Sequence, residues 1–121
     1  MQIRIRRLDA TVPLPTYATA ESAGFDLSAS AEVTVAPRQI ALIPTGLVIE
    51  VPSGYFLGIF ARSSTPLKRG LMVANGVGVI DPDYAGPHDE VRIQVLNIST
   101  SDVTSSRETA SPRASCCRRR G

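Results

Sequence analysis

The chain has 121 residues, of which 43% are hydrophobic, with nine Gly, nine Pro and no Trp. A chain of this length forms one domain with a modest core, and oligomerisation would bury further apolar surface. No apolar run approaches the roughly 18 residues that are needed to cross a bilayer. The N-terminal segment also lacks the apolar region of a signal peptide, so we expect a cytoplasmic protein.

The charged residues are distributed unevenly. Up to Thr104 the chain has 8 Lys and Arg against 10 Asp and Glu, whereas from Ser105 onward it has 5 Arg against 1 Glu. The net charge of +2 therefore arises in the C-terminal segment, and the rest of the chain gives no general argument for nucleic-acid binding. Cys116 and Cys117 are adjacent in this segment, so they cannot crosslink the domain.

Short apolar segments, separated by Pro and Gly, follow one another along most of the chain. Their alternation of apolar and polar residues predicts strands. We expect strands at residues 3–8, 33–35, 39–43, 47–51, 55–60 and 91–98. Their close spacing indicates an all-β sandwich or barrel with at most one short helix. Residues 16–24 are rich in Thr, Ala, Ser and Gly, and we expect a loop that delivers residues 25–27 to a surface rim.

The short helix is expected at residues 65–68, because proline is tolerated at the first helical position and Pro66 lies at its start. The backbone N–H groups of Ser63 and Ser64 would then lie near the N-terminus of the helix, where anions bind. Arg62 adds a planar set of donors that matches phosphate oxygens. This tripeptide is a candidate phosphate site, although Arg-Ser-Ser alone is typical of surface loops.

The segment at residues 75–86 lies between two short apolar segments and predicts a hairpin. Its glycines, Gly76 and Gly78, allow a positive φ or a close approach of the backbone to a ligand. The apolar side chains of Val79 and Ile80 are expected to anchor the next part of the hairpin in the core.

Two carboxylates follow within this segment. Asp81 and Asp83 would project to the same side of an extended chain, with Pro82 fixing φ between them and Tyr84 on the other side. Like charges at close range can raise one pKa towards that of a general base. The alternative from this stretch alone is an Asp-Pro-Asp turn on a solvated loop.

Three segments resemble, in order, the first three motifs of the trimeric dUTPases, which hydrolyse dUTP to dUMP and pyrophosphate. Residues 23–29 are similar to the first motif, residues 61–64 to the second and residues 75–84 to the third, with similar spacing. The third segment reads Asn-x-x-Gly-x-Ile-Asp-x-Asp-Tyr. The resemblance covers about residues 1–104.

The resemblance implies a β-clip or jelly-roll-like barrel that forms a homotrimer, with each active site built from more than one subunit. Asp81 would be the catalytic base that activates a water for attack on the α-phosphorus. Asp26 would hold Mg²⁺ through water, so that the metal neutralises and orients the triphosphate. No membrane and no nucleic acid are implied as partners.

The residues implied to bind dUTP fall into three sets. The phosphate oxygens would contact Arg62, Ser63 and Ser64. The uracil edge would contact Asn75 and the backbone of Gly78, Val79 and Ile80. The deoxyribose would pack on Tyr84, which would thereby exclude a 2′-hydroxyl.

The chain departs from the family pattern after its third motif. Residues 85–90 look like a small insertion in place of the usual Arg-Gly-Glu. The fourth motif, usually Gly-Asp-Arg-Ile-Ala-Gln, and the glycine-rich fifth motif have no match. We therefore expect a C-terminally incomplete dUTPase-like domain at residues 1–104, a disordered Arg- and Ser-rich tail at residues 105–121, and impaired hydrolysis and assembly.

Residues 105–121 are also expected to be the product of a reading-frame shift. Permitted codons for residues 105–118 can be chosen so that the same bases, read from the third position of the first codon, encode Glu-Pro-Gly-Asp-Arg-Ile-Ala-Gln-Gly-Leu-Leu-Leu-Pro. This translation contains the absent fourth motif directly after Val103 and Thr104. A shifted frame would also account for the adjacent cysteines and the arginine run.

Two other functions stay open at this point. One is a catalytically silent domain that binds nucleotides or proteins, or that contacts nucleic acid through its arginine tail with a steep salt dependence. The other is a dCTP deaminase-like enzyme of the same fold, whose pattern the third motif fits less well.

Overall fold

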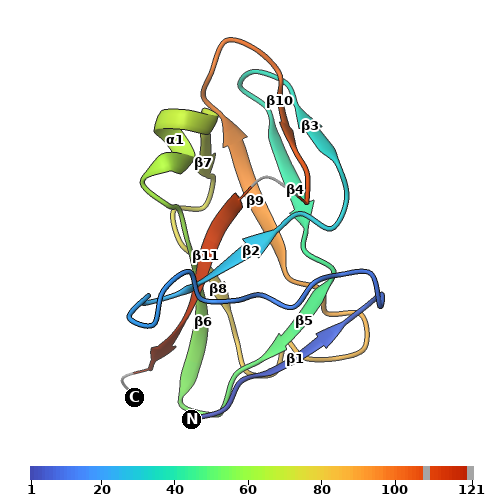
Figure 1. Cartoon of the computed structure of the whole chain (residues 1–121), viewed down its shortest axis with the longest axis vertical. Coiled ribbons are helices and arrows are strands. Elements are labelled where there is room, and N and C mark those ends of the chain that lie inside the picture. Colours follow the sequence, from blue (N-terminus) through green and yellow to red (C-terminus); the bar gives the residue numbers. More distant parts are fainter. Residues whose placement is uncertain (108–109, 120–121) are drawn as a thin grey trace.

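The computed structural model describes residues 1–107 and 110–119, and these form antiparallel β-structure with one short helix (Figure 1). The elements in chain order are β1 (Arg4–Arg7), β2 (Phe25–Ser28), β3 (Val33–Val35), β4 (Ile40–Pro44), β5 (Leu47–Glu50), β6 (Tyr55–Phe60), α1 (Ser64–Arg69), β7 (Leu71–Val73), β8 (Gly78–Ile80), β9 (Arg92–Asn97), β10 (Val103–Ser105) and β11 (Ala110–Arg118). The all-β prediction is confirmed. No helix in the described part of the chain has the length and apolar character of a membrane span.

The largest sheet has the strand order β2-β11-β6-β8, and a second sheet has the order β4-β9-β7. Strand β1 pairs with β5 and β10 pairs with β3; these two pairs lie at the lower and upper ends of Figure 1. The predicted hairpin is confirmed in part. Its flanking strands β7 and β9 do pair, but β8 between them leaves to pair with β6 in the other sheet.

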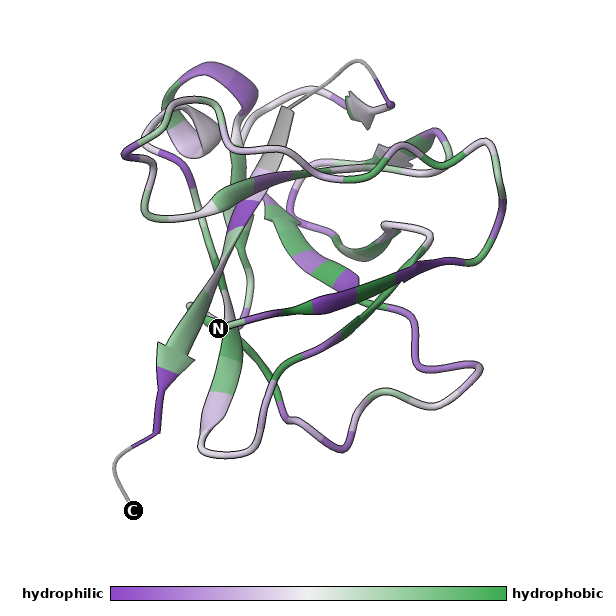
Figure 2. Cartoon of the chain, turned by 60° about the horizontal axis from the view of Figure 1, so that its bottom comes forward, coloured by the Kyte–Doolittle hydropathy of each residue, from purple (hydrophilic) through white to green (hydrophobic). Residues whose placement is uncertain are grey.

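One core cluster joins the sheets, and it is built from alternate residues of their strands. The side chains of Leu27, Leu57, Ile59, Ile93 and Val95 are at most 2% exposed. Burying a side chain of this size stabilises the fold by roughly 1.5–3 kcal/mol. Strand β1 is more hydrophilic, as Figure 2 shows next to the N-terminus, because three of its four residues are arginines, and these three are exposed. Burial alternates along β2 and β9, as the sequence pattern predicts, whereas β5 and β6 each have three consecutive buried residues.

Asn97 ties the end of β9 to the neighbouring segments. It is fully buried, and its side-chain nitrogen donates to the backbone oxygens of Val35 at 2.8 Å and Ser101 at 2.9 Å. Its side-chain oxygen accepts from the N–H of Ser99 at 2.8 Å. A buried amide without partners is costly, so this arrangement fixes the path from β9 to β10.

Residues 25–27 were expected at a surface rim, with no strand assigned to them, whereas residues 25–28 form β2 in the structure. Phe25 and Leu27 are 4% and 0% exposed, whereas Asp26 between them is partly buried. This is the period of a strand, but the segment is short and follows the turn-forming residues 16–24, so the sequence pattern did not reveal the strand.

The structure also differs from the prediction of a disordered tail, since residues 110–118 form β11. This strand lies between β2 and β6 and pairs with both. Ala114 is fully buried, and Pro112 lies where the register with β2 shifts, a place that tolerates its missing N–H. The strand forms backbone hydrogen bonds with both neighbours, and these bonds stabilise it. The periodicity of its residues does not reveal this stabilisation. The parts of the tail prediction at residues 108–109 and 120–121 lie outside the described residues.

Candidate active site

The strand register brings Asp26 together with two arginines. Arg113 on β11 lies opposite Asp26 on β2 and opposite Phe60 on β6, and Arg62 lies just beyond the end of β6. Nη1 of Arg62 donates to Oδ2 of Asp26 at 3.3 Å, and Nε of Arg113 donates to Oδ1 at 3.0 Å. We call Asp26, Arg62 and Arg113 the carboxylate–arginine cluster.

The cluster is partly open to solvent. The side chains of Asp26, Arg62 and Arg113 are 26%, 29% and 35% exposed. Ion pairs with such exposure stabilise a fold by about 0.2–1 kcal/mol each, so they orient the side chains more than they hold the domain together. The sequence analysis singled out Asp26 and Arg62 but missed Arg113, because the tail was expected to be disordered.

Arg62 is held by the start of α1. Its N–H donates to Oγ1 of Thr65 at 3.0 Å, and the Thr65 N–H donates to the Arg62 oxygen at 2.9 Å. Thr65 is only 3% exposed and holds the backbone of the site arginine in place. The sequence analysis did not identify this residue. The predicted helix is confirmed with slightly wider bounds, and Ser63 and Ser64 lie at its start as predicted.

Asn75 and Gly76 lie in the turn from Val73 to Gly76 that follows β7. The Gly76 N–H donates to the Val73 oxygen at 3.0 Å, and Gly76 has a φ of 76°, which side-chain-bearing residues rarely adopt. At Gly78, a Cβ would meet the Cβ of Ile59 at 3.0 Å. The first glycine is therefore required by the backbone conformation and the second by the close packing of β8 on β6.

The two apolar residues of β8 have different environments. Ile80 packs against the core, whereas Val79 is 57% exposed. The prediction that both anchor the chain is wrong for Val79, because successive side chains of a strand point to opposite faces. An exposed apolar side chain thus accompanies the backbone that was predicted to contact uracil.

Asp81 and Tyr84 are the ends of a turn. The Tyr84 N–H donates to the Asp81 oxygen at 3.1 Å, with Pro82 and Asp83 between them. Of the two alternatives that the sequence left open, the Asp-Pro-Asp turn forms and the extended segment does not. Asp81 is exposed directly after β8, while Tyr84 is 40% exposed and its hydroxyl donates to the backbone oxygen of Glu90 at 3.0 Å.

Residues 85–90, which look like an insertion, are fastened to the rest of the domain. The Glu90 carboxylate accepts from the Gly46 N–H at 2.8 Å. The Gly86 oxygen accepts from Nη2 of Arg6 at 3.0 Å. Both contacts are long-range in sequence, and they steady the segment to which the site tyrosine is bonded.

The predicted site residues fall into two groups at opposite ends of β6. Ile80 pairs with Leu57, so Asp81 lies near the beginning of β6, whereas Arg62 follows its end. Since a strand rises about 3.3 Å per residue, the interval from Leu57 to Arg62 corresponds to roughly 17 Å. A single protomer therefore does not bring Asp81 and Arg62 into one site.

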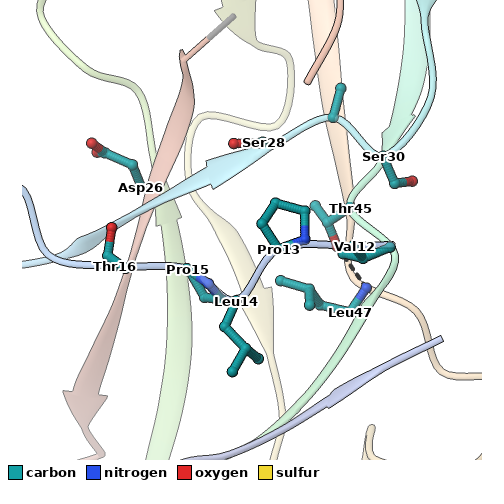
Figure 3. A pocket seen from close by; sticks show the side chains of 11 residues that line it. Val12, Pro13, Leu14, Pro15, Thr16, Asp26, Ser28, Ser30, Thr45 and Leu47 are labelled. Atoms are coloured by element: carbon teal, nitrogen blue, oxygen red, sulfur yellow. Dashed lines mark hydrogen bonds between the residues drawn. The ribbon is translucent and has the colours of Figure 1, made fainter. Parts of the chain in front are cut away.

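A cavity of about 210 Å³ lies next to the cluster, and its lining includes Leu14, Thr16, Asp26, Ser28 and Leu47. Figure 3 shows Asp26 at one end of this lining, with its carboxylate turned away from Leu14 and Leu47. The cavity therefore borders the cluster and does not enclose the carboxylate. The sequence analysis did not predict it, because its walls come from distant segments.

The cluster does not fit a magnesium ion held by Asp26. Mg²⁺ requires a near-octahedral set of oxygen ligands. No group of three or more His, Cys, Asp and Glu residues that could hold a metal occurs within residues 1–107 and 110–119. Both Asp26 oxygens already accept from guanidinium groups, and a dication here would meet two positive charges. The two guanidinium contacts thus disagree with the predicted role of Asp26, which was to hold Mg²⁺ through water.

Two side chains outside both groups of site residues have a shifted pKa. The Thr11 N–H donates to the Asp9 carboxylate at 2.8 Å and lowers the pKa of Asp9. Burial raises the pKa of the Cys116 thiol. Since thiolates are the reactive form, Cys116 gives the site no nucleophile.

Sequence comparison assigns the chain to a family. The dUTPase family model matches residues 10–109. The chain belongs to the dUTPase family. The deoxyuridine 5′-triphosphate nucleotidohydrolase of Desulfitobacterium hafniense (strain DSM 10664 / DCB-2) is 49% identical over 100 residues, which are 80% of this chain and 64% of that protein. The enzyme of the same name from Aquifex aeolicus (strain VF5) is 41% identical over 105 residues, 84% of this chain and 68% of that protein. This dUTPase-family chain thus spans 64% of the length of the D. hafniense relative.

Comparison with solved structures confirms the dUTPase fold. The crystal structure of the dUTPase from Streptococcus mutans matches with a TM-score of 0.89 and 28% identity, covering 100% of this chain and 98% of that chain. A mutant dUTPase from phage phi11 of S. aureus, which coordinates a structural Mg(II) ion, matches with a TM-score of 0.89 and 17% identity, covering 100% and 93%. Because both matches cover the whole chain, β11 lies within the dUTPase-like fold.

Proposed function

We propose that this dUTPase-family chain, completed at its C-terminus, hydrolyses dUTP to dUMP and pyrophosphate. The observation that supports the proposal is that the motif residues form two groups. The group around Arg62 is suited to bind phosphate, and the group around Asp81 supplies a carboxylate and a tyrosine. Measuring pyrophosphate release from dUTP tests it. Ammonia release from dCTP without pyrophosphate release from dUTP would instead favour a deaminase.

Asp81 is the proposed catalytic base. Its carboxylate accepts a proton from water while the water oxygen bonds to the α-phosphorus. The bond from the α-phosphorus to the oxygen that bridges to the β-phosphorus breaks, and this oxygen leaves with the electron pair as part of pyrophosphate. Charge-assisted hydrogen bonds from Arg62, together with the hydroxyls of Ser63 and Ser64, hold the phosphate oxygens.

The third-motif segment is the proposed nucleoside site. Strand β8 is the last strand of its sheet, so one side of its backbone has no neighbouring strand within that sheet. Alternate residues of such a strand direct their N–H and C=O groups to the open side, so part of the backbone of Gly78, Val79 and Ile80 is suited to pair with a base edge. The exposed Asn75 side chain adds a donor and an acceptor for uracil.

Tyr84 is the proposed contact for the deoxyribose, and we predict that Tyr84→Ala narrows the preference for dUTP over UTP. Its ring fills space that a 2′-hydroxyl would need, and the bond to the Glu90 oxygen at 3.0 Å holds the ring in place. The ratio of kcat/KM for dUTP and UTP is the measurement. Tyr84→Phe keeps the ring and should keep most of the preference, whereas unchanged selectivity in Tyr84→Ala would remove this residue from the sugar site.

A homotrimer is the proposed assembly, because separate subunits would complete the divided site. The outer face of β4-β9-β7 supports it. Ile40, Leu42 and Met72 are 59%, 51% and 44% exposed there, and Leu96 lies opposite both Ile40 and Met72. A contiguous apolar face of this kind is typical of an interface.

We predict that the protein with its C-terminal frame restored sediments as a trimer at micromolar concentration. Met72→Glu should shift it towards monomer, because the substitution places a charge on the apolar face. Lys68→Glu, at an exposed position of α1, is the control and should leave the trimer unchanged. A restored protein that sediments as a stable monomer would rule out the trimer.

Magnesium enters the proposal as a partner of the nucleotide and not as a ligand of Asp26. The ion, when bound to the triphosphate, neutralises part of its charge. The residues that this chain supplies for the phosphates are therefore the arginine and the two serines of the second motif. No step of the proposed reaction depends on a metal contact to Asp26.

Residues 105–121 are proposed to be out of frame, with low hydrolysis as the consequence. Because β11 forms from these residues, a frame shift would not remove this strand from the fold. The strand itself stays in place, but its side chains are not those of the fourth motif. Arg113 in particular stands against Asp26.

Among the described arginines of the tail, Arg107 and Arg113 contact the domain, so nucleic-acid binding would have to rest on the exposed Arg118 and Arg119. The Arg107 side chain donates to the backbone oxygens of Thr11 at 3.1 Å and Ser30 at 3.3 Å. Arg113 is paired with Asp26. Both arginines contact their own domain and do not form an outward basic patch.

A further inference from the structure

Asp26 has positively charged donors on both of its carboxylate oxygens. Oδ2 accepts from Nη1 of Arg62 at 3.3 Å, and Oδ1 accepts from Nε of Arg113 at 3.0 Å. Each arginine reaches Asp26 through one nitrogen, so neither forms a two-pronged pair with it. The guanidinium group of Arg113 is engaged through its nitrogen nearest the backbone, which leaves its two terminal nitrogens beyond the ion pair.

The position of Arg113 is set by the backbone. Arg113 is paired with Asp26 on one side and with Phe60 on the other, so β11 is held by both neighbouring strands. The next residue, Ala114, is fully buried and pairs with Phe25 and Ile59. Cross-strand neighbours on one sheet lie close enough to interact directly, so the register alone keeps a positive charge at Asp26.

The charges of the cluster favour an anion over a cation. Two guanidinium groups and one carboxylate give a net charge of +1. A divalent cation at Asp26 would have to displace a guanidinium group and would face both of them. A multiply charged oxyanion would be attracted to both arginines, and each can offer it further N–H donors in a planar arrangement. The side-chain exposures of 29% and 35% leave both arginines accessible to such a ligand.

We propose that Arg113 takes the place of a divalent cation at Asp26, so that the cluster binds a phosphate-type oxyanion without metal. This inference rests on the proposed function, because the natural anion would be the phosphate chain of a nucleotide. The claim concerns binding by the chain as it stands and requires no hydrolysis. Either proposal can therefore fail while the other holds.

Calorimetric titration with inorganic pyrophosphate tests the proposal, in EDTA and in Mg²⁺. The native chain is expected to bind pyrophosphate in EDTA, and Mg²⁺ is expected to weaken binding, because the ion lowers the charge of pyrophosphate. Arg113→Gln is expected to lose about tenfold in affinity in EDTA, as one charge-assisted contact disappears. In Mg²⁺ this variant should bind more tightly than in EDTA, because Asp26 is then open to a cation.

Two further variants complete the test. Arg118→Gln makes the same substitution at an exposed position of β11 and should behave as the native chain. Asp26→Asn raises the net charge of the cluster and should strengthen binding in EDTA, which keeps the test decisive if Arg113→Gln fails to fold. The proposal is overturned if the native chain binds pyrophosphate only with Mg²⁺, if Arg113→Gln matches the native chain in EDTA, or if Asp26→Asn weakens binding.

Discussion

Asp81→Asn in the frame-restored protein is expected to lower kcat for dUTP by about 10²- to 10⁴-fold, the usual cost of losing a general base. The amide has nearly the same shape as the carboxylate but cannot accept the proton of the attacking water. Asp81 is exposed at the end of β8, outside the core, so the fold should stay intact. Single-turnover hydrolysis of dUTP, with a parallel thermal unfolding curve, measures both effects.

Asp83→Asn is the matched control for this prediction. Asp83 is exposed and lies in the same turn, but its place is inside the turn and not at the end of β8. The substitution should change kcat by only a few fold, because the same charge is removed without loss of the base. Near-native turnover by Asp81→Asn would exclude Asp81 as the base, and an equal loss in both variants would point to the charge of the turn.

Restoring the reading frame before residue 105 is expected to raise dUTP hydrolysis by about 10²-fold or more over the chain as written. Misplacement of reacting groups by about 1 Å can cost this much. In the chain as written, β11 carries Arg113 against Asp26, whereas the restored strand carries the fourth motif. The two proteins, assayed side by side for pyrophosphate release, give the comparison.

Deleting residues 105–121 is the control for restoration. The deletion removes β11 from between β2 and β6, so it should lower stability and bring no gain in activity. The coding DNA tests the premise separately. Codons that cannot yield Gly-Asp-Arg-Ile-Ala-Gln in the shifted frame would refute the frame shift, and full activity of the chain as written would refute its functional consequence.

Local sequence patterns were sufficient to predict most of the strands. The strands at residues 33–35 and 55–60 have the predicted bounds, because apolar alternation and flanking turn residues agree there. The bounds of β11 were not predictable in this way. Its place depends on the hydrogen bonds that β2 and β6 offer, and these belong to segments far away in the sequence.

The candidate site was predictable by residue identity and less so by geometry. The motif residues around Arg62 and Asp81 came from the resemblance, but the pairing of Asp26 with Arg113 spans 87 positions of sequence. Such a contact follows from strand register, which one sequence does not specify. The turn at Asp81 was left open because Asp-Pro-Asp suits both an extended segment and a turn.

The central claim is that the Arg62 group and the Asp81 group act together only between subunits. Arg62→Gln and Asp81→Asn subunits of the frame-restored protein each lack one half of every site. In a mixed trimer, one interface joins an intact Arg62 to an intact Asp81, and equal mixing restores about a quarter of all sites. We predict that co-refolding the two inactive proteins yields about a quarter of the activity of the unsubstituted protein. A mixture no more active than the separate variants would contradict the account.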